Sequence, residues 1–219
     1  MSAREDILDR LRSALRDNPA VPEIPRTYRE ESGMSTEKRI DLLVDRLVDY
    51  KAGVTVVGPE GIAPRIAELL AEAGSYVVPA GINEAWLADA EAAFPGRRRT
   101  DSPEAPLGVP ELDAVDAVVT GSAVSVAETG TIILDGSPNQ GRRAITLVPD
   151  HHICVVAADD VAGILPEALR RLDGTRPLTW ISGPSATSDI ELERVEGVHG
   201  PRNLDVIIVR SCDAAALGR

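Results

Sequence analysis

Aromatic residues are scarce in this chain, at 3% of its 219 residues. A hydrophobic core therefore has to be built from Val, Ile, Leu and Ala. Only two cysteines, Cys154 and Cys212, and three histidines are present, which is too few for a cysteine-held iron–sulfur cluster or a zinc site. We expect both thiols to be reduced, and Cys154, which lies in an apolar run, to be buried.

Long apolar runs are also absent, which excludes a transmembrane helix. Residues 1–17 are charged throughout and have no apolar centre, so they do not read as a secretory signal, and we expect a cytoplasmic protein. The 23 Lys and Arg are outnumbered by 35 Asp and Glu, for a net charge of -12. Such a charge repels phosphate backbones and anionic membranes, so nucleic acid is not an expected partner.

The rest of the composition, with 43% hydrophobic and 26% charged residues, is that of a globular protein of one domain.

The first 34 residues are predicted to form an arm outside this domain. Ser2 and Glu5 have capping-box spacing, and an amphipathic helix follows them. Residues 18–34 contain three prolines and predict an extended linker. We divide the chain into an arm, 1–34, and an α/β domain, 35–219; whether the arm packs on its own domain or on a partner is open.

Short Val- and Ile-rich runs then alternate with amphipathic segments. We expect strands at 54–57, 76–78, 115–119, 131–134, 144–148, 152–156, 178–181 and 204–209. We expect helices at 37–50, 63–73, after Asn83 and at 161–172, a helical turn at 123–127, and a loop from 94 to 110. Runs of this kind predict a three-layer α/β/α sandwich with a mixed, mostly parallel sheet. The antiparallel part should fall within 131–156, where no helix separates the strands.

Ligands of open α/β sheets bind beyond the carboxyl ends of strands, and three segments rich in small polar residues are expected at such ends. The first is Thr120–Ser122 with Ala127–Thr131. Glu128 lies in the glycine-flanked turn of this segment. A carboxylate there suits a nucleophile, a general base or a hydrogen-bond anchor, and equally an acid that caps local amides.

The second segment is Ile181–Glu191. Its Gly183-Pro184 pair forces a turn, and Ser188 and Glu191 have capping-box spacing. Hydroxyl groups and free amides at a helix start can cradle an anion, or simply begin a well-capped helix. No Gly-Lys-Ser/Thr and no Gly-x-Gly-x-x-Gly pattern is present, so a P-loop and a dinucleotide fingerprint are excluded.

The third segment is Gly197–Arg202, in which His199 lies among glycines and either approaches a ligand or sits in a solvated turn. His151 and His152 should point to opposite faces of a strand and be structural. The run Arg97–Arg99 is expected to be a solvated loop face, and residues 136–143 a hairpin-like loop able to form a lid.

Taken together, four motifs resemble the LUD-domain family. They are AETGT (127–131), HICVV (152–156), ISGPSATSDIE (181–191) and GVHGP (197–201). The resemblance covers about residues 35–210 and implies the fold shared by sugar isomerases and CoA transferases. It also implies a subunit that supports oxidation of L-lactate to pyruvate beside iron–sulfur partner proteins. This chain lacks cluster-binding cysteine runs, so we expect no cofactor and no metal in it, with the clusters only in the partner subunits.

On this basis we expect one ligand site for a small anion such as a carboxylate. Ser182, Gly183, Ser185 and Thr187 would cradle it, Glu128 and His199 would be the acid/base groups, and Asp189 would orient or cap. The remaining predicted ligand-binding residues are Thr129, Gly130, Thr131, Pro184, Glu191 and Gly200. Two other functions remain open: a stand-alone CoA-transferase- or isomerase-like enzyme, and a non-catalytic scaffold. Formation of a homo-oligomer also remains open.

Overall fold

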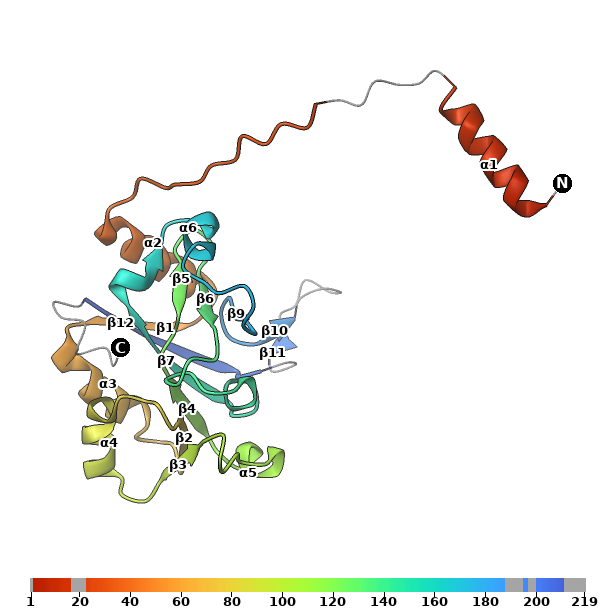
Figure 1. Cartoon of the computed structure of the whole chain (residues 1–219). Helices are drawn as coiled ribbons and strands as arrows, with labels where there is room; N and C mark the ends of the chain where they lie inside the picture. The colour runs from red at the N-terminus through yellow and green to blue at the C-terminus, as the bar shows by residue number, and fades with distance from the viewer. Residues whose placement is uncertain (1, 17–22, 188–194, 197–199, 211–219) are drawn as a thin grey trace.

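The computed structural model describes residues 2–16, 23–187, 195–196 and 200–210, with the backbone alone for 186–187 and 195–196. Its centre is a six-stranded sheet in which every neighbouring pair of strands is parallel (Figure 1). The strands in spatial order are β1 (Gly53–Val57), β12 (Asn203–Val209), β7 (His151–Ala157), β4 (Ala117–Thr120), β2 (Tyr76–Pro79) and β3 (Arg98–Asp101).

Both faces of this sheet are buried, which explains its unbroken apolar strands. On β7, Ile153 and Val155 point into one core while Cys154 and Val156 point into the other. The first core is covered by α3 (Ile62–Leu69), the 3-10 turn η2 (Glu84–Leu87) and α4 (Ala88–Ala93). The second core is covered by α2 (Thr36–Asp49) and by a second, smaller sheet, and α5 (Val109–Asp113) covers an adjoining cluster.

The second sheet has the strand order β8 (Val161–Ala162), β5 (Val124–Val126), β6 (Thr131–Leu134) and β9 (Thr179–Ile181). The pairs β5–β6 and β6–β9 are antiparallel. The short helix α6 (Leu165–Leu169) packs on β5 and β8 through Ala168. Strands β10 (Ala186–Thr187) and β11 (Val195–Glu196) form a separate antiparallel pair. The remaining 3-10 turns are η1 (Pro59–Gly61), η3 (Arg143–Thr146) and η4 (Ala158–Asp160).

The order of the parallel strands creates a crevice between β2 and β4. From β2 the chain continues outward to its neighbour β3, whereas from β4 it continues in the opposite direction across the sheet to β7. Such a reversal is the place where open α/β sheets bind ligands, beyond the carboxyl ends of the two strands. The crevice therefore marks a candidate site on topology alone.

The predicted α/β sandwich with a largely parallel sheet is confirmed, and its antiparallel component lies in the separate small sheet. The finer likeness to sugar isomerases and CoA transferases stays a prediction. The capping box of Ser2 and Glu5 and the cap of α2 by Ser35 are both present. Cys154 is fully buried as expected, and Cys212 lies outside the described residues.

Four local predictions are wrong, and in three of them strand pairing overrides the local pattern. Residues 123–127 contain strand β5 rather than a helical turn, and 144–148 overlap the turn η3, which buries Ile145 without joining a sheet. The expected helix 161–172 is cut to α6, because residues 161–162 pair with β5 and Pro166 begins the helix. The expected loop 94–110 contains β3, a charged edge strand without an apolar signal.

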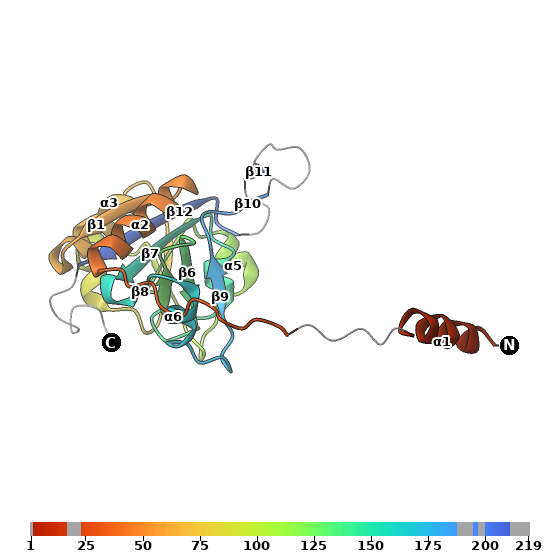
Figure 2. The same cartoon turned by 90° about the horizontal axis from the view of Figure 1, so that it is seen from above.

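The arm begins with α1 (Ala3–Ala14), which buries none of its residues and stands apart from the α/β body in both views (Figure 2). Residues 29–34 by contrast lie on the body. The backbone N–H of Ser32 donates to Glu167 Oε1 at 2.6 Å, and Arg29 pairs with Glu128. The division of the chain at residue 34 stays a prediction. Within the described ranges, no helix is both long and apolar enough to cross a membrane.

The loop after β6 is held across the crevice by two glycines at strand ends. Gly81 N donates to Pro138 O at 3.2 Å and Gly121 N to Asn139 O at 2.9 Å. A Cβ on Gly81 would stand 2.4 to 2.7 Å from atoms of Pro138, and one on Gly121 would stand 2.6 Å from the Asn139 amide nitrogen. Absence of a side chain at both positions is therefore what lets the loop approach the sheet.

We predict that Gly81→Ala lowers the free energy of unfolding by about 1 to 3 kcal/mol, because backbone atoms of Pro138 must move. The matched control is Gly174→Ala, since a Cβ on Gly174 meets nothing within 4 Å. Urea unfolding of both variants measures the difference. Equal stability of the two variants would contradict the close approach described here.

Candidate functional site

Two of the predicted motif segments meet at the end of α2. Gly130 and Gly183 have φ values of +61° and +85°, which favour glycine. A Cβ on Gly130 would stand 2.7 Å from Arg46 Cβ, and one on Gly183 would stand 2.6 Å from Tyr50 Cβ. The two glycines thus allow both turns to pack against the same turn of helix.

A chain of hydroxyl groups joins the same two segments. Thr129 Oγ1 lies 2.8 Å from Thr131 Oγ1, which lies 2.9 Å from Ser182 Oγ. The third segment joins them through the backbone, because Ser185 N donates to Pro201 O at 2.8 Å. The structure therefore brings together Thr129–Thr131, Ser182–Ser185 and the Gly200–Pro201 end of the third segment.

The second and third segments border a hollow of about 190 Å³, which we call the motif cavity, whereas no residue of Thr129–Thr131 is part of its wall. Its wall includes Ser182, Gly183, Pro184, Ser185 and Pro201, together with Arg143, Thr146, Leu147, His152, Thr179, Trp180, Ile181 and Leu204. His152 and Leu204 belong to the amino-terminal halves of β7 and β12. Ser182–Ser185 follow the carboxyl end of β9, as expected, although they adjoin the amino-terminal end of the parallel sheet. The expectation of a carboxyl end is wrong for Gly200, which precedes β12.

Arg143 is the charged residue of the motif cavity wall. No other described residue forms an ion pair with its guanidinium or accepts a hydrogen bond from it. The preceding Arg142 is different, because it donates to both carboxylate oxygens of Asp101 and to Leu107 O. An exposed guanidinium without a protein partner among the described residues, in a wall that also contains serine hydroxyls, is suited to a carboxylate.

Glu128 is placed beside the motif cavity but is not part of its wall. Its side chain is about half exposed, at 45%, and pairs with Arg29 of the arm, while its backbone carbonyl accepts from Arg46 Nε. Asp189, Glu191 and His199 lie outside the described residues, and Thr187 is described only as backbone of β10. Their predicted roles, like that of Glu128, stay predictions.

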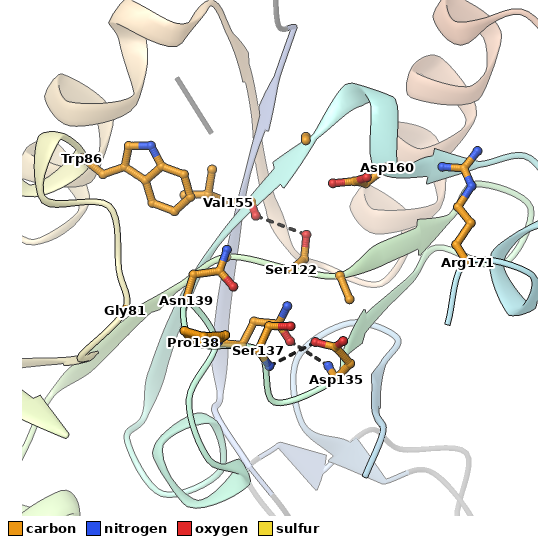
Figure 3. A pocket seen from close by; sticks show the side chains of 14 residues that line it. Gly81, Trp86, Ser122, Asp135, Ser137, Pro138, Asn139, Val155, Asp160 and Arg171 are labelled. Atoms are coloured by element: carbon orange, nitrogen blue, oxygen red, sulfur yellow. Dashed lines mark hydrogen bonds between the residues drawn. The ribbon is translucent and has the colours of Figure 1, made fainter. Parts of the chain in front are cut away.

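A second hollow lies at the crevice between β2 and β4 and has a volume of about 480 Å³. We call it the carboxyl-edge pocket. Gly81 follows β2, Gly121 and Ser122 follow β4, and the β6 loop supplies the wall from Asp135 to Gln140. Figure 3 shows Trp86 at one end of the pocket and Arg171 at the other, with Ser122 between them and Asp160 on the Arg171 side.

Most of this second hollow cannot be recognised from the sequence. Ser122 belongs to a predicted strand-end segment and 136–143 to a predicted lid loop, but no sequence pattern marks Trp86, Asp160 or Arg171 as pocket residues. The usable signal was the pair of glycines, Gly81 and Gly121, directly after two strands. Arg143 was likewise noted only as part of the loop, and nothing in its local sequence separates it from Arg142.

A third hollow, an apolar cleft of about 670 Å³, lies on the other side of the β6 loop. Leu134, Pro138 and Leu178 contribute to its wall, and the Arg142–Asp101 ion pair closes one side. Arg143 stands where this cleft and the motif cavity adjoin. No group of three or more His, Cys, Asp or Glu side chains suited to a metal ion occurs among the described residues.

Burial shifts the titration of two side chains on β7. It lowers the pKa of His152 to about 3, helped by the neighbouring His151, so His152 is neutral, with Nε2 2.8 Å from Thr120 Oγ1. Burial also raises the pKa of the Cys154 thiol to about 12, which makes it unreactive. His151 instead contacts Asp205, so the two histidines have different partners and structural roles.

Known proteins resemble this chain over most of its length. The model of the LUD domain matches residues 110–209. A protein of Deinococcus radiodurans named Lactate utilization protein C is 45% identical over 86% of this chain and 87% of its own. The chain belongs to the LUD-domain family. A Lactate utilization protein C of Shouchella clausii is 30% identical over half of each chain. The crystal structure of a DUF162-family protein from D. radiodurans superposes with a TM-score of 0.68 and 41% identity, covering 81% of this chain and 99% of that one.

The neutral, buried His152 of this LUD-domain protein predicts a loss of stability in acid. The unfolded chain binds a proton below the ordinary histidine pKa of 6.5, whereas the folded protein does so only near pH 3. Stability is therefore complete above pH 6.5 and falls by about 1.4 kcal/mol per pH unit below it. Urea unfolding at several pH values above 5 measures this slope, because carboxylates remain mostly ionised there.

In the same experiment, His152→Gln removes the slope and His151→Gln retains it, since the buried imidazole is still present. A wild-type stability that is flat between pH 6.5 and 5 would contradict the burial of a neutral His152.

Proposed function

We propose that this protein is a component of a lactate-utilisation system. It binds L-lactate in the motif cavity and supports oxidation of lactate to pyruvate together with iron–sulfur partner proteins. The name of the D. radiodurans relative, which is 45% identical over most of both chains, supports the metabolic role. The single structural observation that supports the ligand is Arg143, an exposed cation without a partner among the described residues, in a wall that also contains Ser182 and Ser185.

The motif cavity, at about 190 Å³, is the smallest of the three hollows described above, and a three-carbon acid is small enough to enter it. Arg143 would pair with the lactate carboxylate in two-pronged geometry, and Ser182 would bond the lactate hydroxyl. The glycine turns at 130 and 183 hold Ser182 in place by packing on α2.

Oxidation of lactate to pyruvate releases two protons, one from C2 and one from the hydroxyl group, and two electrons. The electrons would pass to iron–sulfur clusters of the partners. Glu128 and His199 are the proposed acid/base groups and Asp189 the orienting group. The chain of hydroxyl groups runs from Ser182 through Thr131 and ends at Thr129, the residue that follows Glu128 in the sequence. It therefore offers a route for the proton of the lactate hydroxyl. Glu128 would first have to leave its ion pair with Arg29.

The test is binding of L-lactate to the full chain, measured by isothermal titration calorimetry. Arg143→Gln should weaken binding about tenfold to a hundredfold, because a charge-assisted hydrogen bond to the ligand contributes about 1.5 to 3 kcal/mol. Arg99→Gln, which removes an exposed arginine of β3 far from the cavity wall, should leave binding unchanged.

The same variants should then be compared in lactate-dependent dye reduction with the iron–sulfur partners present. Arg143→Gln should raise the lactate concentration needed for half-maximal rate, and Arg99→Gln should not. Equal binding and equal rates for both variants would contradict the assignment of the motif cavity to lactate.

A further inference from the structure

The carboxyl-edge pocket is not used by the function proposed above. It lies beyond the carboxyl ends of β2 and β4, whereas the motif cavity adjoins the amino-terminal halves of β7 and β12. We propose that the carboxyl-edge pocket is a second ligand site, which binds a polyhydroxylated anion such as a sugar acid or a sugar phosphate.

The wall of this pocket is held in place before any ligand arrives. Asp135 N donates to Gln140 Oε1 at 2.6 Å, and Ser137 N donates to Asp135 Oδ1 at 3.1 Å (Figure 3). Arg176 Nη1 reaches Asp135 Oδ2 at 2.7 Å and so balances its charge. With Gly81 and Gly121 fixing the far side of the loop, little conformational entropy is lost on binding.

The anionic part of the ligand is specified by Arg171 at one end of the pocket. Its Nη1 donates to Asp159 O at 2.8 Å, and no carboxylate among the described residues pairs with the guanidinium. The remaining N–H groups form the planar fork that binds a carboxylate or a phosphate in two-pronged geometry.

The hydroxyl groups of the ligand are specified by the middle of the pocket. Ser122 Oγ donates to Val155 O at 3.2 Å, which leaves its lone pairs to accept from a ligand. The Asn139 carboxamide has no side-chain hydrogen bond to any described residue and offers both donors and an acceptor. Asp135 adds carboxylate oxygens that accept from a ligand hydroxyl. Neighbouring hydroxyls of a sugar both donate and accept, so they match this mixture.

The carboxyl-edge pocket is larger than the motif cavity, at about 480 Å³ against about 190 Å³. It therefore accommodates a larger ligand than lactate, such as a five- or six-carbon sugar acid or sugar phosphate. At the end opposite Arg171, the indole of Trp86 closes the pocket as part of the first hydrophobic core and is 4% exposed.

The test is calorimetric titration of the full chain with four probes, D-gluconate, D-ribose 5-phosphate, D-ribose and inorganic phosphate. We expect at least one of the two hydroxylated anions to bind, and to bind about tenfold or more tightly than D-ribose or phosphate, since each of these lacks half of the recognised groups. Whichever of gluconate and ribose 5-phosphate binds more tightly identifies the preferred anionic group as a carboxylate or a phosphate.

Three variants localise the binding. Arg171→Gln and Asn139→Ala should each lower the affinity for the probe that binds the wild type by about tenfold or more, and Arg99→Gln should not. Arg171→Gln should leave L-lactate binding unchanged, so this proposal and that for the motif cavity can fail separately. Absence of binding by both hydroxylated anions at millimolar concentration, or equal binding to wild type and Arg171→Gln, would overturn the proposal.

Discussion

Burial of β7 on both faces is the constraint on which the rest of this structure depends. The strand lies between β12 and β4, and its alternate side chains reach two separate cores. At one end, His152 contributes to the motif cavity, and at the other, Val155 and Ala157 contribute to the carboxyl-edge pocket. With a rise of about 3.3 Å per residue, the five-residue step from His152 to Ala157 places these two wall residues roughly 17 Å apart along the strand. A rigid, dry strand therefore fixes the separation of two sites that differ in size and chemistry.

Pairing decides which arginines hold the fold and which are free for a ligand. Arg142 and Arg176 are saturated by Asp101 and Asp135, so they fix the β6 loop. Arg143 and Arg171 have no carboxylate partner among the described residues, and each lies in the wall of a hollow.

The arm adds a further contact, since Arg29 pairs with Glu128. Burial raises the pKa of Glu167, but hydrogen bonds from Ser32, Gly163 and Ile164 outweigh it and bring that pKa to about 2. The arm thus stays attached to the body at neutral pH beside one of the proposed acid/base groups.

The sequence predicted the buried strands well, because continuous Val and Ile runs in β7 and β12 have few alternatives to a covered sheet. It failed where tertiary contacts decide, as in β3, whose polar residues are stabilised by pairing with β2, and in β5, whose small residues resemble a helical turn. The motif residues from 129 to 131 and from 182 to 185 were found from their pattern, and the structure brings them together. The importance of Arg143 could not be seen in the same way, because only the position of Asp101 distinguishes it from Arg142. The carboxyl-edge pocket was missed because Gly81, Trp86 and Arg171 are far apart in the chain.

Binding of lactate by Arg143 in the motif cavity is the assignment on which the proposed function depends. A crystal structure of the full chain with L-lactate is the most direct test. We expect the lactate carboxylate on the Arg143 guanidinium and the lactate hydroxyl at Ser182. Lactate bound in the carboxyl-edge pocket, with the motif cavity filled only by water, would contradict it.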